Sequence, residues 1–311
     1  MKILLDCDPG IDDAIALAVA LGSPDVELVA VTTVAGNVGL GATTANALRV
    51  CAFLGREDVS VVAGADRPLQ RSAVLAHHVH GSDGLGGAPL PEAARPPDPG
   101  FGPDRIVSEI MGAPGEVTLV AVGPLTNVAL ALRREPRIAH TARRLVVMGG
   151  SYTAGNITAA AEFNIHADPD AAAEVVAAPW EPVLLGLDVT LRVRVGPVVM
   201  DRWRGFGTLS GQLLEPALAG YLDSRTRADG GGPAVHDACA LACALQPDMF
   251  TLTPATVRVE TSDPETLGRT TVELGPATGA HALVATDVDV DRLWALMEAA
   301  FGRVSADVRG R

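Results

Sequence analysis

The chain has 311 residues, 48% hydrophobic and 20% charged, which is enough for one large α/β domain. Its net charge of −13 disfavours polymeric nucleic acid and suits a neutral small molecule or a bound cation. No apolar run reaches the roughly 18 residues of a membrane span, and no secretory leader follows Met1. We therefore expect no membrane contact. We also expect a cytoplasmic location, because the cysteines lack a disulfide-framework spacing. These are Cys7, Cys51, Cys239 and Cys243.

Strand-like apolar runs alternate with helical stretches, a pattern typical of parallel βαβ units. The first elements predicted are strand Lys2 to Cys7, helix Asp12 to Leu21, strand Val26 to Val34, helix Gly41 to Leu54 and strand Ser60 to Ala63. An irregular loop is predicted from Pro89 to Pro103. The pattern then resumes with strand Val117 to Val122, helix Leu125 to Arg134, strand Leu145 to Met148, helix Asp168 to Ala178 and strand Pro182 to Leu187.

The last third of the chain is less regular. It predicts helices Thr208 to Arg227 and His236 to Leu245, a small hairpin Val257 to Val272, strand Ala282 to Thr286 and helix Asp289 to Phe301. We expect residues 1–311 to form a single α/β domain, with an open, mostly parallel twisted sheet flanked by helices in a Rossmann-like arrangement. Such sheets bind ligands beyond the carboxyl ends of their strands, so the residues that follow each strand are the candidates for a site.

Four aspartates follow the first predicted strand, and the turn Pro9-Gly10 lets them converge; they are Asp6, Asp8, Asp12 and Asp13. Carboxylates this close repel one another. A helix dipole offsets ~0.3–1 kcal/mol per acid, and Asp12 is a candidate N-cap. Capping explains one aspartate and not four. A hard cation such as Ca²⁺ or Mg²⁺ is the better explanation of the cluster.

Other strands are also followed by polar residues. Asn37 follows the second strand, Thr126-Asn127 opens a later helix, and His236-Asp237 opens another. Each of these alone is explained by a turn or a helix cap. The stretch from 148 to 164 adds Asn156, Glu162 and Asn164 after a buried strand. Together with the aspartates, these residues favour a polar site over isolated turns.

Taken together, these motifs resemble the inosine-uridine-preferring nucleoside hydrolase family over nearly the whole chain. The most specific match is Asp-Cys-Asp-Pro-Gly-Ile-Asp-Asp at 6 to 13. The others follow in the family's order: Val-Ala-Gly-Asn at 34 to 37, His-Gly-Ser-Asp-Gly-Leu-Gly-Gly at 80 to 87, Gly-Pro-Leu-Thr-Asn at 123 to 127, Met-Gly-Gly at 148 to 150, Ala-Glu-Phe-Asn at 161 to 164 and Val-His-Asp-Ala at 235 to 238.

The resemblance implies a calcium ion and a ribose site. It assigns Ca²⁺ to the carboxylates of Asp8, Asp13 and Asp237 and to the backbone carbonyl of Thr126, with Asp6 in support. The implied sugar contacts are Asp12 and Asn37 near the 2′-hydroxyl, Asn164 on the 2′ and 3′ side, Asn156 and Glu162 at the 5′-hydroxyl, and Met148 packed near the sugar.

The implied activity is hydrolysis of the N-glycosidic bond of ribonucleosides, in nucleoside salvage or catabolism, by a calcium-bound water that Asp8 activates. His236 is the candidate acid for the leaving base, and His80 is expected to line the base side. Tyr221 is a candidate base contact, although a packing role fits it equally well. His77 and His78 are expected to be polar loop residues. The preferred base stays open, and the family implies a homodimer or homotetramer.

Three rival functions are considered. A haloacid-dehalogenase-type phosphohydrolase using Mg²⁺ also begins with Asp-x-Asp, but it needs a downstream lysine and no lysine follows Lys2. A non-catalytic nucleoside or sugar binder could keep the calcium site, although every implied catalytic residue is present. A ribosyl conjugate such as ADP-ribose is disfavoured because the carboxylate of Glu162 would repel a 5′-phosphate.

Overall fold

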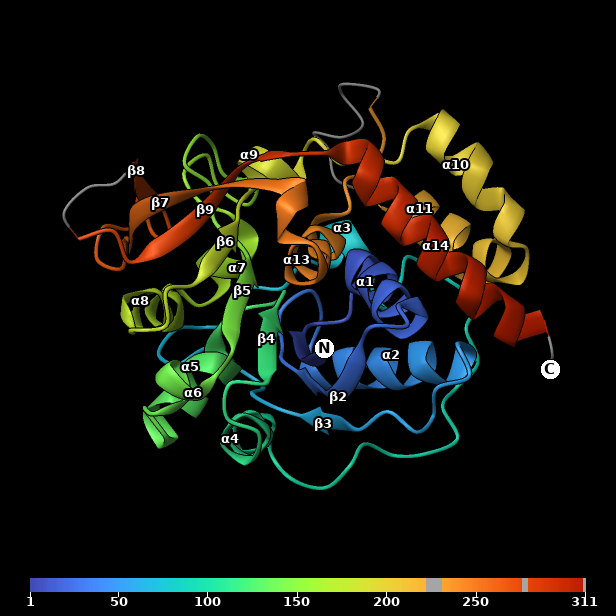
Figure 1. Cartoon of the computed structure of the whole chain (residues 1–311), viewed down its shortest axis with the longest axis horizontal. Coiled ribbons are helices and arrows are strands. Elements are labelled where there is room, and N and C mark those ends of the chain that lie inside the picture. The colour runs from blue at the N-terminus through green and yellow to red at the C-terminus, as the bar shows by residue number, and fades with distance from the viewer. Residues whose placement is uncertain (222–230, 276–278, 310–311) are drawn as a thin grey trace.

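The computed structural model describes residues 1–221, 231–275 and 279–309, with side chains up to residue 305. Nine strands in this part form one sheet in the order β3-β2-β1-β4-β5-β6-β9-β7-β8 (Figure 1). The strands are β1 Lys2–Cys7, β2 Glu27–Thr33, β3 Val61–Ala63, β4 Val117–Ala121, β5 Arg144–Met148, β6 Val183–Leu185, β7 Phe250–Val259, β8 Thr270–Leu274 and β9 Ala282–Val288.

The sheet is parallel except at one edge. Strands β1 to β6 and β9 pair in parallel, whereas β7 runs antiparallel to both β9 and β8. The chain builds outward from β1 through β2 to β3, then crosses to place β4 on the other side of β1. The carboxyl ends of β1 and β4 therefore flank the switch point where open α/β sheets bind ligands. The predicted fold class is confirmed.

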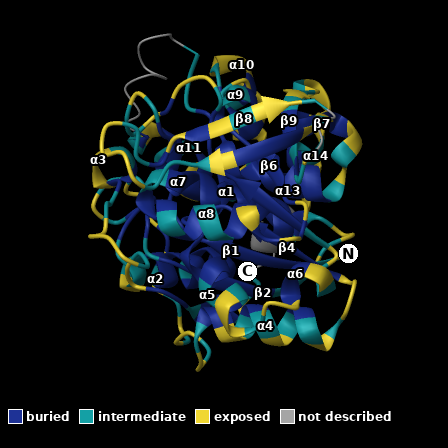
Figure 2. Cartoon of the chain, turned by 90° about the vertical axis from the view of Figure 1, so that its left-hand side faces the viewer, coloured by how far each residue is buried: buried dark blue, intermediate teal, exposed yellow. Residues whose placement is uncertain are grey.

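Helices cover both faces of the sheet, which explains why its strands read as continuous apolar runs. One hydrophobic cluster contains Ile3 and Leu5 of β1, and a second contains the intervening Leu4. Figure 2 shows the central strands buried between the two layers. The first layer is α1 Ile11–Gly22, α2 Leu40–Phe53, α13 His236–Leu245 and α14 Val290–Arg309; the second is α4 Gly102–Gly112, α5 Thr126–Arg134, α6 Ile138–Thr141 and α8 Pro169–Ala177.

The remaining helical segments of the described residues are short. They are α3 His77–His80, α7 Phe163–Ala167, α9 Leu187–Thr190, α10 Pro197–Trp203 and α11 Glu215–Gly220, with the 3-10 turns η1 Arg204–Phe206 and η3 Pro247–Met249 and the π-helical turn η2 Ser210–Leu214. No helix in the described residues is long and apolar enough to cross a membrane.

Two predicted elements differ in extent from the structure. The helix expected at 208–227 runs without a break from 208 to 220, and the π-helical turn η2 lies inside it just before Pro216, whose ring removes a backbone donor. Residues 222–227 of that prediction lie outside the described residues. The hairpin expected at 257–272 is part of the main sheet, because β7 begins at Phe250 and also pairs with β9.

Candidate active site

A cavity that encloses about 590 Å³, open solvent at its mouth included, lies at the carboxyl edge of the sheet. Most of the residues predicted for the site line it: Asp12, Asn37, His80, Met148, Asn156, Glu162, Asn164, Tyr221, His236 and Asp237. The structure thus brings together segments that lie more than 200 residues apart in the sequence. Asp8, Asp13 and Thr126 are buried beneath this lining rather than in it.

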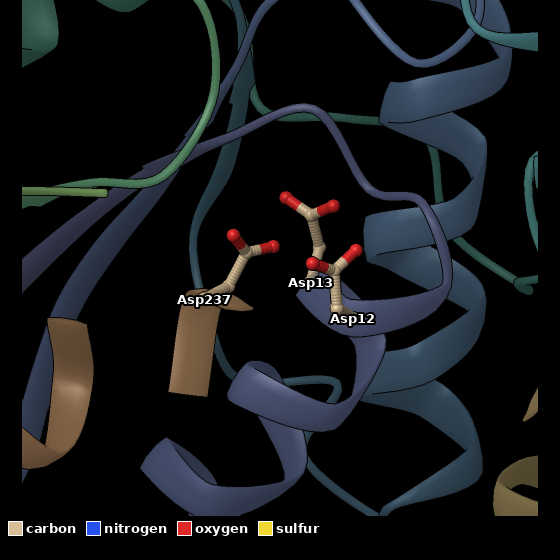
Figure 3. Close-up of side chains that lie close together, drawn as sticks. All are labelled: Asp12, Asp13 and Asp237. Carbon is tan, nitrogen blue, oxygen red and sulfur yellow. The ribbon is translucent and has the colours of Figure 1, made fainter. Parts of the chain in front are cut away.

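Three buried carboxylates meet at the floor of the cavity. Asp12 and Asp13 lie in the first turn of α1, and Asp237 lies in the first turn of α13. One oxygen from each lies within 4.8 Å of the others, and Figure 3 shows the three carboxylates pointing toward a common space. This set includes Asp12, which the sequence assigned to the sugar.

Asp8 lies against this cluster in a pocket of backbone. Its Oδ2 accepts the backbone N–H of Asn37 at 2.7 Å, while its Oδ1 is buried without a hydrogen-bond partner among the described residues. Glycine is required on both sides, because a Cβ on Gly36 would lie 2.1 Å from Oδ2 and one on Gly123 would lie 2.6 Å from Oδ1. An unpaired buried carboxylate oxygen is costly, and a cation would satisfy it.

Asp13 organises the turn that carries the acids. Its Oδ1 accepts the backbone N–H of Asp8 at 3.1 Å, and its Oδ2 accepts that of Gly10 at 2.9 Å. Helix α1 therefore begins after Gly10, and the expectation that Asp12 is the N-cap is wrong. The reason is that Asp13 reaches back over the turn, which leaves Asp12 free to face the cavity.

Burial raises the pKa of every acid in the group, and repulsion by neighbouring aspartates adds to this for Asp8, Asp12 and Asp237. Burial and the neighbouring Asp13 raise the pKa of Asp12 to about 8. The same causes hold the pKa of Asp8 well above its ordinary value, and burial with Asp12 does so for Asp237. The pKa of Asp13 is also raised by burial, against opposing backbone hydrogen bonds. Carboxylates whose charged form is this unfavourable are suited to bind a divalent cation that prefers oxygen ligands.

Asp6 lies behind the cluster on β1. Its Oδ1 accepts the hydroxyl of Thr32 at 2.5 Å and the amide of Asn127 at 2.7 Å. Burial raises its pKa to about 7, against those two hydrogen bonds. Asn127 also donates to the carbonyl of Thr33 and accepts from the backbone of Ala65. Asn127 thus ties three strand ends together, a role that the sequence reading of it as a cap had missed.

Asn37 and Asn164 are oriented by backbone groups on the side of the cavity assigned to the sugar. The amide nitrogen of Asn37 donates to the carbonyl of Asp8 and to Asp13 Oδ2, each at 3.1 Å. That of Asn164 donates to the carbonyls of Val122 at 2.8 Å and Met148 at 3.2 Å. With each nitrogen so fixed, the amide oxygen is the group that either side chain can offer to a ligand.

Glu162 and Asn156 also line the cavity. Glu162 is buried and caps α7, accepting backbone N–H groups of Gly150, Asn164 and Ile165 at 2.8–3.1 Å. Asn156 is exposed at the rim, where its Oδ1 accepts the backbone N–H of Phe163 at 2.9 Å. Its amide N–H₂ is the group that it can present to a ligand.

Aromatic and imidazole rings cover the remaining wall. His80 Nδ1 accepts the backbone N–H of Ile11 at 3.1 Å, so the neutral ring carries its proton on Nε2. Burial, with the nearby His236, lowers the pKa of His80 to about 3. Tyr221 packs edge-on against His80 with ring centroids 5.8 Å apart. His236 Nδ1 lies 2.8 Å from the Thr190 hydroxyl, which leaves Nε2 on the other edge of the ring.

The histidine-rich stretch was partly misread. His77 and His78 belong to the one-turn helix α3 rather than to a loop, and His78 lines the cavity at its rim. The cavity also includes apolar residues that no motif indicated: Ala76, Val79, Val122 and Ile157. Apolar residues at a rim carry no distinctive sequence signal. The sequence signal available for α3 was its three histidines, in His-His-Val-His at 77 to 80.

Comparison with known proteins identifies the family. The family model described as inosine-uridine preferring nucleoside hydrolase matches residues 3–295. The chain belongs to this family. The resemblance found in the sequence motifs is therefore confirmed, and the chain is a nucleoside hydrolase.

Relatives of this nucleoside hydrolase match it over almost its full length. The pyrimidine-specific ribonucleoside hydrolase RihA of Klebsiella pneumoniae subsp. pneumoniae is 41% identical over 94% of both chains, and that of Enterobacter sp. is 40% identical with the same coverage. Among solved structures, a purine-preferring ribonucleoside hydrolase from Gardnerella vaginalis is 30% identical, with a TM-score of 0.92 over 98% of this chain and 99% of that chain.

Proposed function

We propose that this nucleoside hydrolase cleaves the N-glycosidic bond of ribonucleosides with a calcium ion in its acidic cluster, and that it prefers pyrimidine nucleosides. The observation that carries the proposal is the arrangement of the cavity. Asp12 and Asp237 line it, Asp8 and Asp13 lie buried beneath this lining, and the amides of Asn37, Asn156 and Asn164 line it together with the rings of His80, Tyr221 and His236. A ribose would lie against the acids and amides, with its base beside the rings.

Calcium, when bound, supplies positive charge that offsets the acids and lowers the pKa of water. Asp8, Asp13 and Asp237 would hold it, and the presence of Asp12 in the same group makes Asp12 a further candidate contact. Asp8 is the proposed base, because its buried Oδ1 accepts no other hydrogen bond among the described residues and its pKa is raised. Thr126 would add its carbonyl.

The residues around the sugar would act on the transition state. As the bond to the base breaks, positive charge develops at C1′, and fixed carboxylates stabilise it. Asn37, Asn164 and Glu162 would hold the hydroxyl groups so that C1′ stays over Asp8. His236 would donate a proton to the leaving base. His80, whose pKa of about 3 keeps its ring neutral, would instead donate a hydrogen bond from Nε2.

The pyrimidine preference rests on the relatives. The chain is about 40% identical to hydrolases described as pyrimidine-specific and 30% identical to one described as purine-preferring. A 5′-phosphate is disfavoured by the buried carboxylate of Glu162, so nucleotides and ADP-ribose should be poor substrates. We further propose a homodimer or homotetramer, and a cytoplasmic location that suits four buried, unpaired cysteines.

A substrate panel tests this proposal. Purified protein is incubated with uridine, cytidine, inosine, adenosine and uridine 5′-monophosphate, with and without a calcium chelator, and free ribose is measured. We expect fastest release from uridine or cytidine, poor release from the nucleotide and none with chelator. Binding of nucleosides without release of ribose from any of them would support the non-catalytic binder instead.

A second prediction concerns His236. An His236→Ala variant should hydrolyse uridine about 10²–10⁴-fold more slowly, the usual contribution of a general acid. It should lose less than about tenfold on 4-nitrophenyl riboside, whose leaving group departs without a proton. Steady-state kinetics on both substrates measure the difference. Equal losses on the two would show that His236 supports the site without protonating the base.

A further inference from the structure

The loop at residues 151–161 joins β5 to α7 and carries two residues of the cavity wall, Asn156 and Ile157. Several of its residues, including Asn156, are exposed, so packing alone restrains them little. At the α7 end of the loop, Asn156 is held by its backbone N–H, which donates to the carbonyl of Ala161 at 3.0 Å, and by its Oδ1, which accepts the backbone N–H of Phe163. Its position then depends on how the other end of the loop, which follows β5, is held.

Thr270, which lies in the edge strand β8, holds the first residue of the loop. Its hydroxyl accepts the backbone N–H of Ser151 at 2.8 Å and donates to the carbonyl of Ser151 at 2.6 Å. Thr270 is buried at the start of β8, and no described residue of this strand lines the cavity. One side chain thus satisfies both backbone groups of Ser151.

Asp188, which lies in α9, holds Ser151 and the two residues after it. Its carboxylate accepts the backbone N–H of Tyr152 at 2.9 Å and the hydroxyls of Ser151 and Thr153. Ser151 Oγ in turn accepts the backbone N–H groups of Thr153 and Ala154 at 3.2 Å each. Hydrogen bonds to an ionised carboxylate are among the stronger ones in proteins.

The anchored residues lie beside apolar side chains of the sheet, among them Leu184, Val257 and Val284. Apolar side chains offer no hydrogen bonds, so the polar groups at the base of the loop depend on Asp188, Thr270 and Ser151 for theirs.

From these contacts we propose that Asp188 and Thr270 are positioning residues for the 5′ end of the substrate. They fix the base of loop 151–161 so that the amide of Asn156 meets the 5′-hydroxyl of the ribose. The inference rests on the proposed function, because it needs a ribonucleoside in the cavity. Neither residue lines that cavity among the described residues, so both act through the loop.

The test compares uridine with 5′-deoxyuridine, which lacks the hydroxyl that Asn156 would bind. Thr270→Val and Asp188→Ala should each lower kcat/KM for uridine about tenfold, the effect of losing one hydrogen bond in a charged site. The rate for 5′-deoxyuridine should change less than about twofold, so the preference for uridine collapses. Asn156→Ala should give the same collapse.

Conservative and distant variants separate positioning from a loss of folding. Thr270→Ser keeps the hydroxyl and should keep the preference for uridine. Thr253→Val removes a hydroxyl that pairs with Thr286 in the same sheet and should alter neither rate. Equal losses on both substrates, or none on either, would overturn the proposal. If the wild type cleaves both substrates equally, the positioning inference fails while the hydrolase function stands. If it cleaves no nucleoside, the hydrolase function fails.

Discussion

An Asp8→Asn enzyme should hydrolyse uridine on the order of 10³–10⁴-fold more slowly than the wild type, because the change removes the proposed base. It also replaces an anionic oxygen directed at the cation with a neutral amide. Calcium affinity, measured by titration calorimetry, should fall in the same variant. Asp25→Asn, an exposed aspartate outside the cavity, is the matched control and should leave both quantities unchanged. Activity that survives Asp8→Asn would refute the assignment of the base.

The same substitution has an opposite effect on the metal-free protein. Asp8 is buried, and burial together with Asp13 disfavours its charged form. Replacing it with a neutral side chain removes that unfavourable interaction, so chelator-treated Asp8→Asn should unfold at a higher temperature than chelator-treated wild type. Calcium should raise the unfolding temperature of the wild type and hardly change that of the variant. The catalytic acids thus lower the stability of the fold that carries them.

Removal of calcium should abolish activity and destabilise the protein more at pH 8 than at pH 5. In the unfolded chain the aspartates release protons near pH 4, whereas burial and repulsion raise the folded pKa of Asp12 to about 8. Between these values the folded state binds more protons, so stability of the metal-free protein falls as pH rises, by about 1.4 kcal/mol per pH unit for each proton. The proposed calcium ion would offset this negative charge when bound.

Thermal unfolding with and without chelator, at pH 5 and pH 8, measures this dependence. The chelator should lower the unfolding temperature more at pH 8, and re-addition of calcium should restore both stability and activity. Magnesium should restore them less well, because it demands a compact octahedral shell that a cluster spread over two helices does not favour. An equal effect of chelator at the two pH values would contradict a metal site in these acids.

The sequence predicted the sheet well because its signal is local. The strands were predicted from apolar runs, such as Lys2–Cys7, that are followed by helical stretches. The polar residues after each strand indicated which edge of the sheet holds the site. The helix at Gly102–Gly112 was missed, because the Pro-rich loop before it hides its start and only Ile106 and Ile110 mark its buried face. The π-helical turn before Pro216 was not predicted, because an apolar pattern continues across it.

The candidate site was predicted as a set of residues rather than as an arrangement. The motifs predicted most of the residues that line the cavity, such as Asn37 and Asp237. They did not predict which of the acids lie close together. The reach of Asp13 across the turn and the inclusion of Asp12 in the cluster depend on side-chain geometry. The anchors Asp188 and Thr270 could not be found in the sequence, because their contacts join segments 37 and 119 residues apart.

The acids of the cluster come from opposite ends of the chain, and this affects how the enzyme matures. During synthesis, the turn that carries Asp8, Asp12 and Asp13 emerges more than 200 residues before Asp237. Helix α1 can pack against α13 only once the chain has been made as far as Leu245. A nascent or truncated chain that ends before α13 would therefore lack a complete ion site, and hydrolytic activity would report that synthesis has passed this helix and that the chain has folded around it.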